Sequence, residues 1–317
     1  MGKNLITGGL GFLGSRVAKR LLDDGEEVVL FGRTTKSRFI KDIEEDKRLK
    51  IVQGDLRNFA QVIEAVKDND IECIYHLGAL LANEAEVSPQ TAYEVNVNGT
   101  YHVLEAARLF KVSCVIFPST IATYGQGIPD VVNEDVVQYP NNMYGVTKVI
   151  GERLGEYYYH RYGVNFRSVR FPAIVGPERT TGLSSYTSLM IIEPAMGRTY
   201  RTYVDEKVRC PFIYKNDAVN ALVSLRYADE ACLKRRVYNI EVISCTAAEE
   251  AAAVKKYLPE AKIEFHPDKK SVEILNAWAK DMDGTRAFQE WGFRLQYGLE
   301  ETIKAVIDEV RQGTFTS

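Results

Sequence analysis

A tyrosine and a lysine four residues apart carry the clearest chemical signal in this chain. Tyr144 and Lys148 stand in the segment Tyr-Gly-Val-Thr-Lys, and this spacing places both side chains on one face of a helix. The pKa of a free phenol is about 10, and a nearby ammonium lowers it by favouring the phenolate. The pair predicts a tyrosine that exchanges a proton with a substrate hydroxyl, although such a pair by itself is also compatible with a surface contact.

Two hydroxyl side chains precede this pair at the end of an apolar run. Ser119 and Thr120 follow residues 114–118, whose composition is typical of a buried strand. Ligands of open α/β sheets bind beyond the carboxyl ends of the strands. We therefore expect Thr120, with Ser119 beside it, to hydrogen-bond the reacting oxygen.

Three glycines spaced three residues apart follow the first apolar run. Gly8, Gly11 and Gly14 open a helical pattern that starts with Phe12 and Leu13. Gly8 suits a tight turn, Gly11 lets the backbone approach a pyrophosphate, and the first helical N–H groups can bind phosphate oxygens. In this strand-to-helix position the motif predicts a dinucleotide site; a tight turn without a ligand is the alternative.

The end of the second strand bears on which dinucleotide is bound. Gly32 and Arg33 stand there, where NAD-binding proteins carry an acid for the adenosine ribose. Gly32 leaves room for a 2′-phosphate and Arg33 can bind it, so NADP is favoured over NAD; a solvated basic loop is the alternative. After the third strand, Asp55, followed by Leu56, brings a carboxylate towards the adenine amino group, although Asp is also a common helix cap here.

These residues need a framework of alternating strands and helices, and the chain has that pattern. Apolar, β-branched runs predict strands at 4–7, 27–31, 50–53, 73–76, 114–118 and 166–171. Apolar residues at three- and four-residue spacing predict helices at 12–24, 59–66, 92–110 and 142–162. The order predicts an α/β fold with a doubly wound parallel sheet of the Rossmann type.

The regular alternation weakens past residue 176, where the loop-like segment 177–182 begins. We expect residues 1–175 to form the dinucleotide-binding Rossmann domain, completed by part of 210–245. Residues 176–317 are expected to form mainly a smaller C-terminal lobe that binds the substrate.

Composition argues against several classes of partner. The 317 residues are 45% hydrophobic and carry a net charge of −3, so neither nucleic acid nor a membrane surface is expected as a partner. The apolar runs are too short to span a bilayer and the N-terminus lacks a signal-peptide pattern, so we expect a cytoplasmic protein. The five cysteines include no C-x-x-C pair and the histidines are scattered, so neither a disulfide framework nor a metal site is expected.

Five motifs, in this order and spacing, resemble those of the extended short-chain dehydrogenase/reductase superfamily. They are the glycine loop, His76-Leu77-Gly78-Ala79, Asn96-Val97-Asn98-Gly99-Thr100, Ser119-Thr120, and Tyr144 with Lys148. The resemblance implies NAD(P) as cofactor, Tyr144 as proton donor and acceptor, Lys148 bound to the nicotinamide ribose, and Thr120, with Ser119, orienting the substrate.

The same resemblance implies further contacts with the cofactor and with a second subunit. The additional cofactor residues are Leu77, Gly78, Ala79, Asn96, Phe171 and Ile174. In the superfamily, helices equivalent to 92–110 and 142–162 commonly form a four-helix bundle between subunits, which implies a homodimer.

Within the superfamily, several segments are similar to the short-chain type of L-threonine 3-dehydrogenase. They include residues 92–101, 118–121, 145–148, 154–159 and 290–293. This similarity implies hydride transfer between nicotinamide and a small hydroxy or keto substrate, such as an L-threonine-like 3-hydroxy acid. Three departures are Ala82 in place of a serine, Ala279 in place of a proline, and the missing acid on the second strand.

The residues expected to face the substrate come from three segments. They are Leu81 and Ala82 after the fourth strand, Thr180, Thr181 and Ser184 in a polar loop, and Trp278. Two other functions stay open. A nucleotide-sugar 4-epimerase or dehydratase shares the motifs, but its usual diphosphate-binding arginine aligns with Cys210, one place after Arg209. A catalytically silent NADP-sensing protein on the same fold is the remote alternative.

Overall fold

The computed structural model describes residues 2–313, which form two compact units. Unit 1 comprises the residues up to 123 together with 140–170 and 219–238; unit 2 comprises 124–139, 171–218 and the residues from 239 onward. This division differs from a single boundary near residue 175, because the chain passes between the units several times. The return of 219–238 to unit 1 falls within the range 210–245 expected to complete the first domain.

A seven-stranded sheet is the centre of unit 1. In spatial order its strands are β11 (Val237–Asn239), β7 (Phe166–Phe171), β5 (Cys114–Thr120), β4 (Ile71–His76), β1 (Lys3–Thr7), β2 (Val28–Gly32) and β3 (Leu49–Gln53). β1 pairs in parallel with β2 and β4, and the pairs β2–β3 and β4–β5 are also parallel. The strand order reverses between β1 and β4, so a ligand is expected beyond the carboxyl ends of these two strands. The predicted doubly wound parallel sheet is confirmed.

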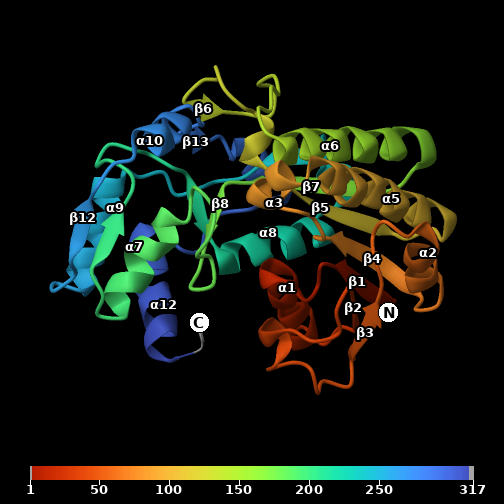
Figure 1. Ribbon diagram of the computed structural model, residues 1–317. Coiled ribbons are helices and arrows are strands. Elements are labelled where there is room, and N and C mark those ends of the chain that lie inside the picture. The colour runs from red at the N-terminus through yellow and green to blue at the C-terminus, as the bar shows by residue number, and fades with distance from the viewer. Residues whose placement is uncertain (1, 314–317) are drawn as a thin grey trace. The chain divides into compact units, whose positions relative to one another are not determined.

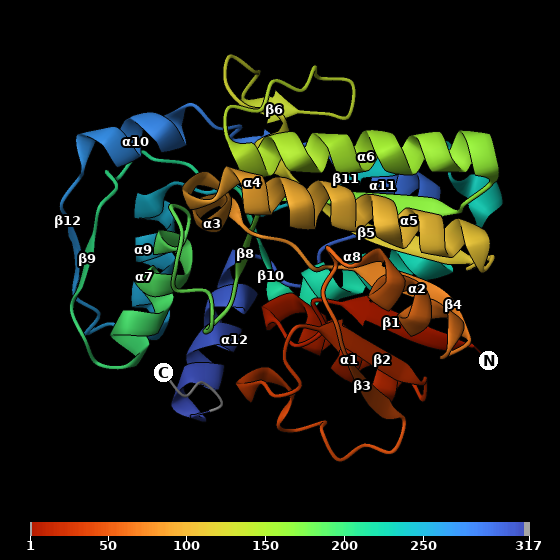
Figure 2. The same cartoon turned by 45° about the vertical axis from the view of Figure 1, so that its right-hand side comes forward.

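Helices cover both faces of this sheet. On one face α2 (Phe59–Lys67), α5 (Gly99–Leu109) and α6 (Met143–Tyr162) lie side by side (Figures 1 and 2). On the other face α1 (Phe12–Asp23) and α8 (Lys215–Tyr227) are joined by a 2.8 Å hydrogen bond from Arg20 to Asn220. Shorter elements of unit 1 are η1 (Arg38–Ile40), α3 (Ala82–Val87), η3 (Ile121–Thr123) and η4 (Glu230–Cys232). The core between sheet and helices includes Leu5, Val29, Ile74, Leu104 and Phe117.

The predicted helix 92–110 is continuous, but its winding changes. α4 (Pro89–Ala92) leads into a π-helical segment, η2 (Tyr93–Asn98), and then into α5. Periodicity in the sequence does not reveal this wider turn, because a π-helical segment of six residues is too short to show a period of its own. Such segments are frequent at functional sites, and this one contains Asn96.

Helix α6 is capped at both ends and lies close to the sheet. The Asn142 side chain accepts a 2.8 Å hydrogen bond from the Gly145 N–H group at its start, and Gly163 takes the left-handed backbone conformation at its end. A Cβ atom on Gly151 would lie 2.5 Å from the Phe117 ring, and one on Gly155 would lie 2.3 Å from the ring of Phe166. Only glycine at these two positions lets the helix approach β5 and β7 so closely.

Unit 2 contains more regular structure than the sequence pattern predicts. Its helices are α7 (Tyr186–Ala195), α9 (Ala247–Tyr257), α10 (Lys269–Asn276), α11 (Thr285–Trp291) and α12 (Leu299–Arg311). Its strands form the parallel pairs β8 (Ala173–Val175) with β10 (Phe212–Tyr214), β9 (Tyr200–Thr202) with β12 (Ile263–Phe265), and β6 (Val131–Val132) with β13 (Asp281–Met282). Strands of two or three residues are too short to have a recognisable alternation, which is why the pattern missed them.

The described part of the chain has neither a membrane-spanning helix nor a cluster of metal-ligating side chains. Within residues 2–313, no helix combines the length and the apolarity needed to cross a membrane. Over the same residues, His, Cys, Asp and Glu side chains do not gather in groups of three or more that could hold a metal ion.

Candidate active site

The start of α6 and the end of β5 bring the predicted acid/base residues together in unit 1. Tyr144 and Lys148 lie on one face of the helix, with Lys148 Nζ 5.7 Å from the centroid of the Tyr144 ring. A Cβ atom on Gly145 would lie 2.4 Å from the Ala122 carbonyl oxygen, so the helix start packs directly on the turn that follows Thr120. The Thr120 hydroxyl accepts a 3.2 Å hydrogen bond from the Ala122 N–H group, which fixes its orientation.

Lys148 is buried in surroundings that disfavour its charge. Its Nζ donates a 2.7 Å hydrogen bond to the Pro118 carbonyl oxygen and lies 4.4 Å from the centroid of the Phe117 ring. Burial lowers the pKa of Lys148 to about 7, and the carboxylate of Glu152, one helical turn further on, opposes that change. The ammonium is therefore close to losing its proton at neutral pH.

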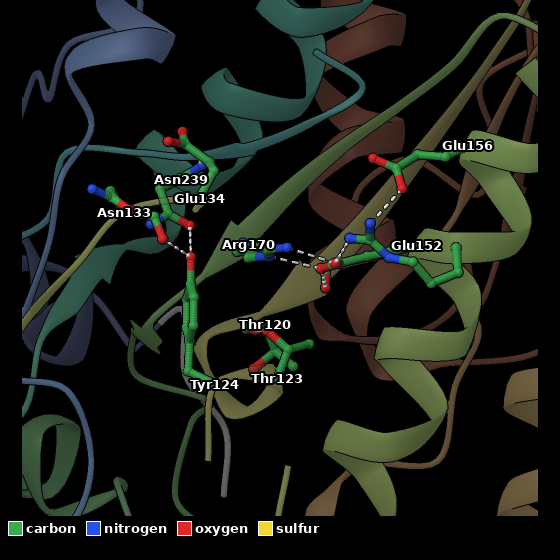
Figure 3. A network of polar contacts seen from close by, with 11 residues as sticks. Thr120, Thr123, Tyr124, Asn133, Glu134, Glu152, Glu156, Arg170 and Asn239 are labelled. Carbon is green, nitrogen blue, oxygen red and sulfur yellow. Dashed lines mark hydrogen bonds and ion pairs between the residues drawn. The ribbon is translucent and has the colours of Figure 1, made fainter. Parts of the chain in front are cut away.

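Glu152 is held by a buried ion pair behind Lys148. Arg170 on β7 donates two hydrogen bonds to its carboxylate, from Nε at 2.8 Å and from Nη2 at 2.7 Å (Figure 3). The Ser119 hydroxyl donates a third, of 2.5 Å, to Glu152 Oε1. Ser119 was expected beside the substrate oxygen, but its hydroxyl hydrogen is given to Glu152. Thr120, at the end of β5, instead precedes the turn on which the start of α6 packs.

Asn96 connects the helix of Tyr144 to the loop that follows β4. Its amide Nδ2 donates to the Leu80 carbonyl oxygen and to Thr147 Oγ1, both at 3.0 Å, and its Oδ1 accepts a 2.8 Å bond from the Leu80 N–H group. Thr147 in turn donates a 2.8 Å bond to the Tyr144 carbonyl oxygen. The π-helical segment therefore fixes both the loop and the first turn of α6.

His76 at the end of β4 is a neutral part of the same framework. Its Nε2 lies 3.0 Å from the Thr100 hydroxyl, which gives its own hydrogen to the Asn96 carbonyl oxygen. His76 Nε2 must therefore carry the proton, so Nδ1 accepts the hydrogen of the Thr7 hydroxyl at 2.7 Å. Burial, with a smaller effect from the Lys148 ammonium, lowers the pKa of His76 to about 3.

The glycine loop has the geometry of a dinucleotide cradle. Gly8 has a φ of +66°, and a Cβ atom there would lie 2.8 Å from the backbone of Gly78. A Cβ atom on Gly14 would lie 2.4 Å from the Gly8 carbonyl oxygen, so α1 packs directly on the loop. Gly11 caps α1 without a side-chain hydrogen bond, so no cap side chain occupies the first-turn N–H groups of Phe12 and Leu13. These residues fit a bound pyrophosphate.

The four residues expected to contact the adenosine lie at or just after the ends of β2 and β3. Gly32 is half-buried and ends β2, and Arg33 is exposed immediately after it. Asp55 accepts a 2.6 Å hydrogen bond from Arg57 Nη2, and that guanidinium, despite partial burial, lowers the pKa of the Asp55 carboxyl. Arg33 adds a smaller effect in the same direction, and Leu56 is buried beside them.

The remaining residues expected to contact the cofactor (Leu77, Gly78, Ala79, Phe171 and Ile174) or the substrate (Leu81, Ala82, Thr180, Thr181, Ser184 and Trp278) divide between the units. In unit 1, Leu81 and Ala82 are exposed at the start of α3, and Leu77, Gly78 and Ala79 are half-buried between β4 and that helix. In unit 2 lie Phe171, Ile174, Thr180, Thr181, Ser184 and Trp278. Phe171 and Ser184 are buried, Thr180 and Thr181 are exposed, and Ile174 and Trp278 are half-buried.

The polar loop of unit 2 is anchored to its own apolar cluster. The Tyr203 hydroxyl donates a 2.7 Å hydrogen bond to the Leu183 carbonyl oxygen. Leu183 and Trp278 both pack against the cluster formed by Tyr186, Met190 and neighbouring side chains. Ser184 and Trp278 therefore belong to one packed region of this unit.

The sequence-based prediction assigned no role to several residues of the site. They are Thr7, Thr100, Thr147, Glu152 and Arg170. One signal was present, because Tyr144, Lys148 and Glu152 follow each other at four-residue intervals along the predicted helix. A second was the charge of Arg170 inside the otherwise apolar end of a predicted strand.

Comparisons with known proteins are consistent with this geometry. Residues 4–240 match the NAD dependent epimerase/dehydratase family. An uncharacterised epimerase/dehydratase of Staphylococcus aureus is 31% identical over 98% of both chains. Among solved structures, an L-threonine dehydrogenase from Clostridium difficile is 31% identical, with a TM-score of 0.92, and covers 100% of this chain and 99% of its own. An L-threonine dehydrogenase from Cupriavidus necator is 28% identical, with a TM-score of 0.88, covering 96% of this chain and 99% of its own.

Proposed function

Because the chain belongs to the NAD-dependent epimerase/dehydratase family, we propose that it is an NAD(P)-dependent oxidoreductase that oxidises a small 3-hydroxy amino acid, with L-threonine as the first candidate. The observation that carries the proposal is the placement of Thr120, Tyr144 and Lys148 together in unit 1. The match of an L-threonine dehydrogenase along the whole chain supports the substrate class.

The proposed reaction uses the protein residues to move one proton. Tyr144, as phenolate, takes the proton of the substrate hydroxyl, and the electron pair of that O–H bond forms the carbonyl. The C–H bond on the same carbon breaks at the same time, and its hydrogen leaves as hydride with the electron pair of that bond. Thr120 donates a hydrogen bond to the same oxygen, and the Lys148 ammonium stabilises the phenolate. The bound nicotinamide supplies the chemistry of a hydride acceptor, or of a hydride donor in the reverse direction.

We propose that the cofactor lies along the glycine loop and that NADP is preferred. Gly8, Gly11 and the first turn of α1 would hold the pyrophosphate, and Lys148 would bind the nicotinamide ribose. Exposed Arg33 beside Gly32 supports a 2′-phosphate site, because a guanidinium binds phosphate through two parallel hydrogen bonds. Asp55, held by Arg57, would face the adenine.

A sugar nucleotide is the second candidate substrate, because the matched family and the relative from Staphylococcus aureus are both described as epimerase/dehydratase. The hydrogen bonds that Arg209 makes within the protein argue against a sugar-nucleotide substrate. Arg209 donates to the Ser244 carbonyl oxygen at 2.8 Å and to Glu249 at 3.3 Å, while Cys210 next to it is buried. A diphosphate would have to displace these contacts. A catalytically silent NADP-sensing protein is disfavoured by the complete acid/base pair.

We further propose a cytoplasmic homodimer built through α5 and α6. Tyr101, Leu109, Val146, Tyr157 and Tyr162 are large apolar side chains that remain exposed on these two helices. A four-helix bundle between two copies would bury them. The cytoplasm keeps cysteine thiols reduced, and all five cysteines are free thiols.

Absorbance of the reduced nicotinamide tests the function. Purified protein is mixed with L-threonine and either NAD or NADP, in parallel with other hydroxy acids, sugars and sugar nucleotides. Turnover of threonine that falls by a factor of about 100 or more in Tyr144→Phe, with cofactor affinity retained, is the expected result. Turnover confined to a sugar nucleotide, with cofactor retained through purification, would assign the epimerase function instead.

A further inference from the structure

Glu152 completes a row of three functional side chains along α6. Tyr144, Lys148 and Glu152 follow at four-residue intervals, so their Cα atoms are about 6 Å apart along the helix axis. Lys148 and Glu152 are both on the buried face. The Glu152 side chain is fully buried, as is its partner Arg170 to within 2%. A buried charge of this kind has a large desolvation cost unless it is paired. Because Glu152 does not reach solvent, its charge must have a role other than keeping the surface soluble.

The groups around Lys148 leave Glu152 as its nearby counter-charge. On α6 its ionisable neighbours are Tyr144 and Glu152, and β4 contributes His76, which is neutral. Among the described residues, β5 contributes the Pro118 carbonyl oxygen and the Phe117 ring to the surroundings of Lys148. The cations Arg170, on β7, and Arg153, on α6, both donate hydrogen bonds to the Glu152 carboxylate.

We propose that Glu152 is a positioning residue for the reaction, whose clamped carboxylate keeps Lys148 in the ammonium form on which the Tyr144 phenolate depends. The clamp has two purposes. Arg170 and Ser119 together donate three hydrogen bonds, which keep the carboxylate ionised although it is buried. They also hold it towards the sheet, behind Lys148, so that it does not reach the substrate hydroxyl. This inference rests on the proposed function of Tyr144 and Lys148, and it assigns Ser119 to the support of Glu152.

The consequence is a chain of electrostatic effects that a titration can follow. Without the carboxylate, burial removes the proton of Lys148 at a lower pH. The phenolate then loses the ammonium that stabilises it, so Tyr144 loses its proton only at a higher pH. A neighbouring opposite charge typically changes a pKa by 1–3 units, so we expect the Tyr144 midpoint to rise by about one pH unit or more in Glu152→Gln.

The experiment is a tyrosinate absorbance titration of the protein saturated with NADP, with Tyr144→Phe subtracted to isolate Tyr144. It needs no substrate, so its outcome is separate from the identity of the substrate. Lys148→Met removes the ammonium completely, so it should give the largest rise of the Tyr144 midpoint. Glu156→Gln, the same substitution one turn further along α6 where Glu156 pairs with exposed Arg153, is the matched control and should leave the midpoint unchanged.

Two variants separate an electrostatic role from a purely structural one. Arg170→Lys keeps both charges but loses the two-bond geometry, so the midpoint should stay near that of the wild type. In the single variant Glu152→Gln, the buried Arg170 cation loses its partner, which could prevent folding. The double variant Glu152→Gln with Arg170→Gln removes that cation as well, and the Tyr144 midpoint should still rise in it. Three outcomes would each overturn the inference. They are a wild-type Tyr144 midpoint in this double variant, a rise of the midpoint in Arg170→Lys equal to that in Glu152→Gln, and the absence of a Tyr144 titration in the wild type.

Discussion

Asn96 donates a 3.0 Å hydrogen bond to Thr147 across 51 positions of the chain, and this bond joins the π-helical segment to the helix that carries Tyr144. The same amide holds the backbone of Leu80 through two further bonds. The candidate catalytic helix and the loop after β4 are thus positioned by one side chain.

Substitution of this amide should lower both stability and turnover. Asn96→Ala leaves buried partners unsatisfied, and we expect it to lower the free energy of unfolding by about 2 kcal/mol. Thr147→Val removes the connection from Asn96 to α6 and the hydrogen bond to the Tyr144 carbonyl oxygen, but it keeps both bonds between Asn96 and Leu80. It should therefore lower kcat while the affinity for cofactor is retained. Urea denaturation and steady-state kinetics check this; equal losses of cofactor affinity in both variants would contradict separate roles for the two connections.

The pKa of Lys148 predicts a rise in stability with pH. Because that pKa is lowered to about 7 from 10.5, the unfolded chain binds one more proton than the folded chain between these two values. The contribution of Lys148 to the free energy of unfolding should therefore rise from pH 7 towards pH 10, by up to about 1.4 kcal/mol per pH unit. Denaturation of the wild type and of Lys148→Met across this range measures it, and parallel curves would show that the lysine keeps its ordinary pKa.

His76 should remain neutral well below physiological pH. Its pKa of about 3, against 6.5 in an unfolded chain, means that only the unfolded state binds the proton between these values. Stability is then lost as pH falls from about 6.5. Nitrogen-15 NMR of labelled histidine, with His76→Gln for assignment, should give an Nε2–H imidazole that does not titrate between pH 8 and pH 5. An Nδ1–H tautomer, or a midpoint near 6.5, would refute the hydrogen-bond assignment.

Arg33 is expected to select the cofactor. A hydrogen bond to a charged group contributes about 1.5–3 kcal/mol, so Arg33→Ala should weaken NADP binding by about tenfold to a hundredfold and leave NAD binding nearly unchanged. Arg48→Ala removes an exposed arginine that pairs with Asp46 before β3 and provides the control. Isothermal titration with both cofactors measures the effect, and equal weakening for NAD and NADP would exclude a 2′-phosphate site at Arg33.

The polar loop of unit 2 is expected to bind the polar end of the substrate. Thr180→Val and Ser184→Ala should raise KM for the substrate and leave cofactor affinity unchanged. Ser224→Ala, on α8, is a matched control because its exposed hydroxyl donates only to backbone oxygens of its own helix. Unchanged kinetics in both loop variants would remove this loop from the substrate site.

Local patterns in the sequence were sufficient to predict the framework and the closeness of Tyr144 and Lys148. Tyr144 and Lys148 are neighbours because a helix repeats every 3.6 residues, and the glycine loop is contiguous between a strand and a helix. The predicted strand 166–171 is confirmed at both ends, and the order of strands and helices led to the correct fold class. These features depend on contacts between residues that are close in the sequence. They can therefore be predicted from a single amino-acid sequence.

Tertiary structure decided the rest, because it depends on which surfaces pack together. Ser119 and Thr120 are adjacent, and adjacent residues of a strand point to opposite faces; the sequence does not say which face α6 covers. Ser119 meets Glu152 across 33 positions and Arg170 meets it across 18, both through the close packing of α6 on the sheet. The exchange of segments between the two units is likewise a long-range property. The sequence alone placed Tyr144 and Lys148 on one face of a helix, and the packing of α6 on β5 and β7 supplied the buried carboxylate of Glu152 beside them.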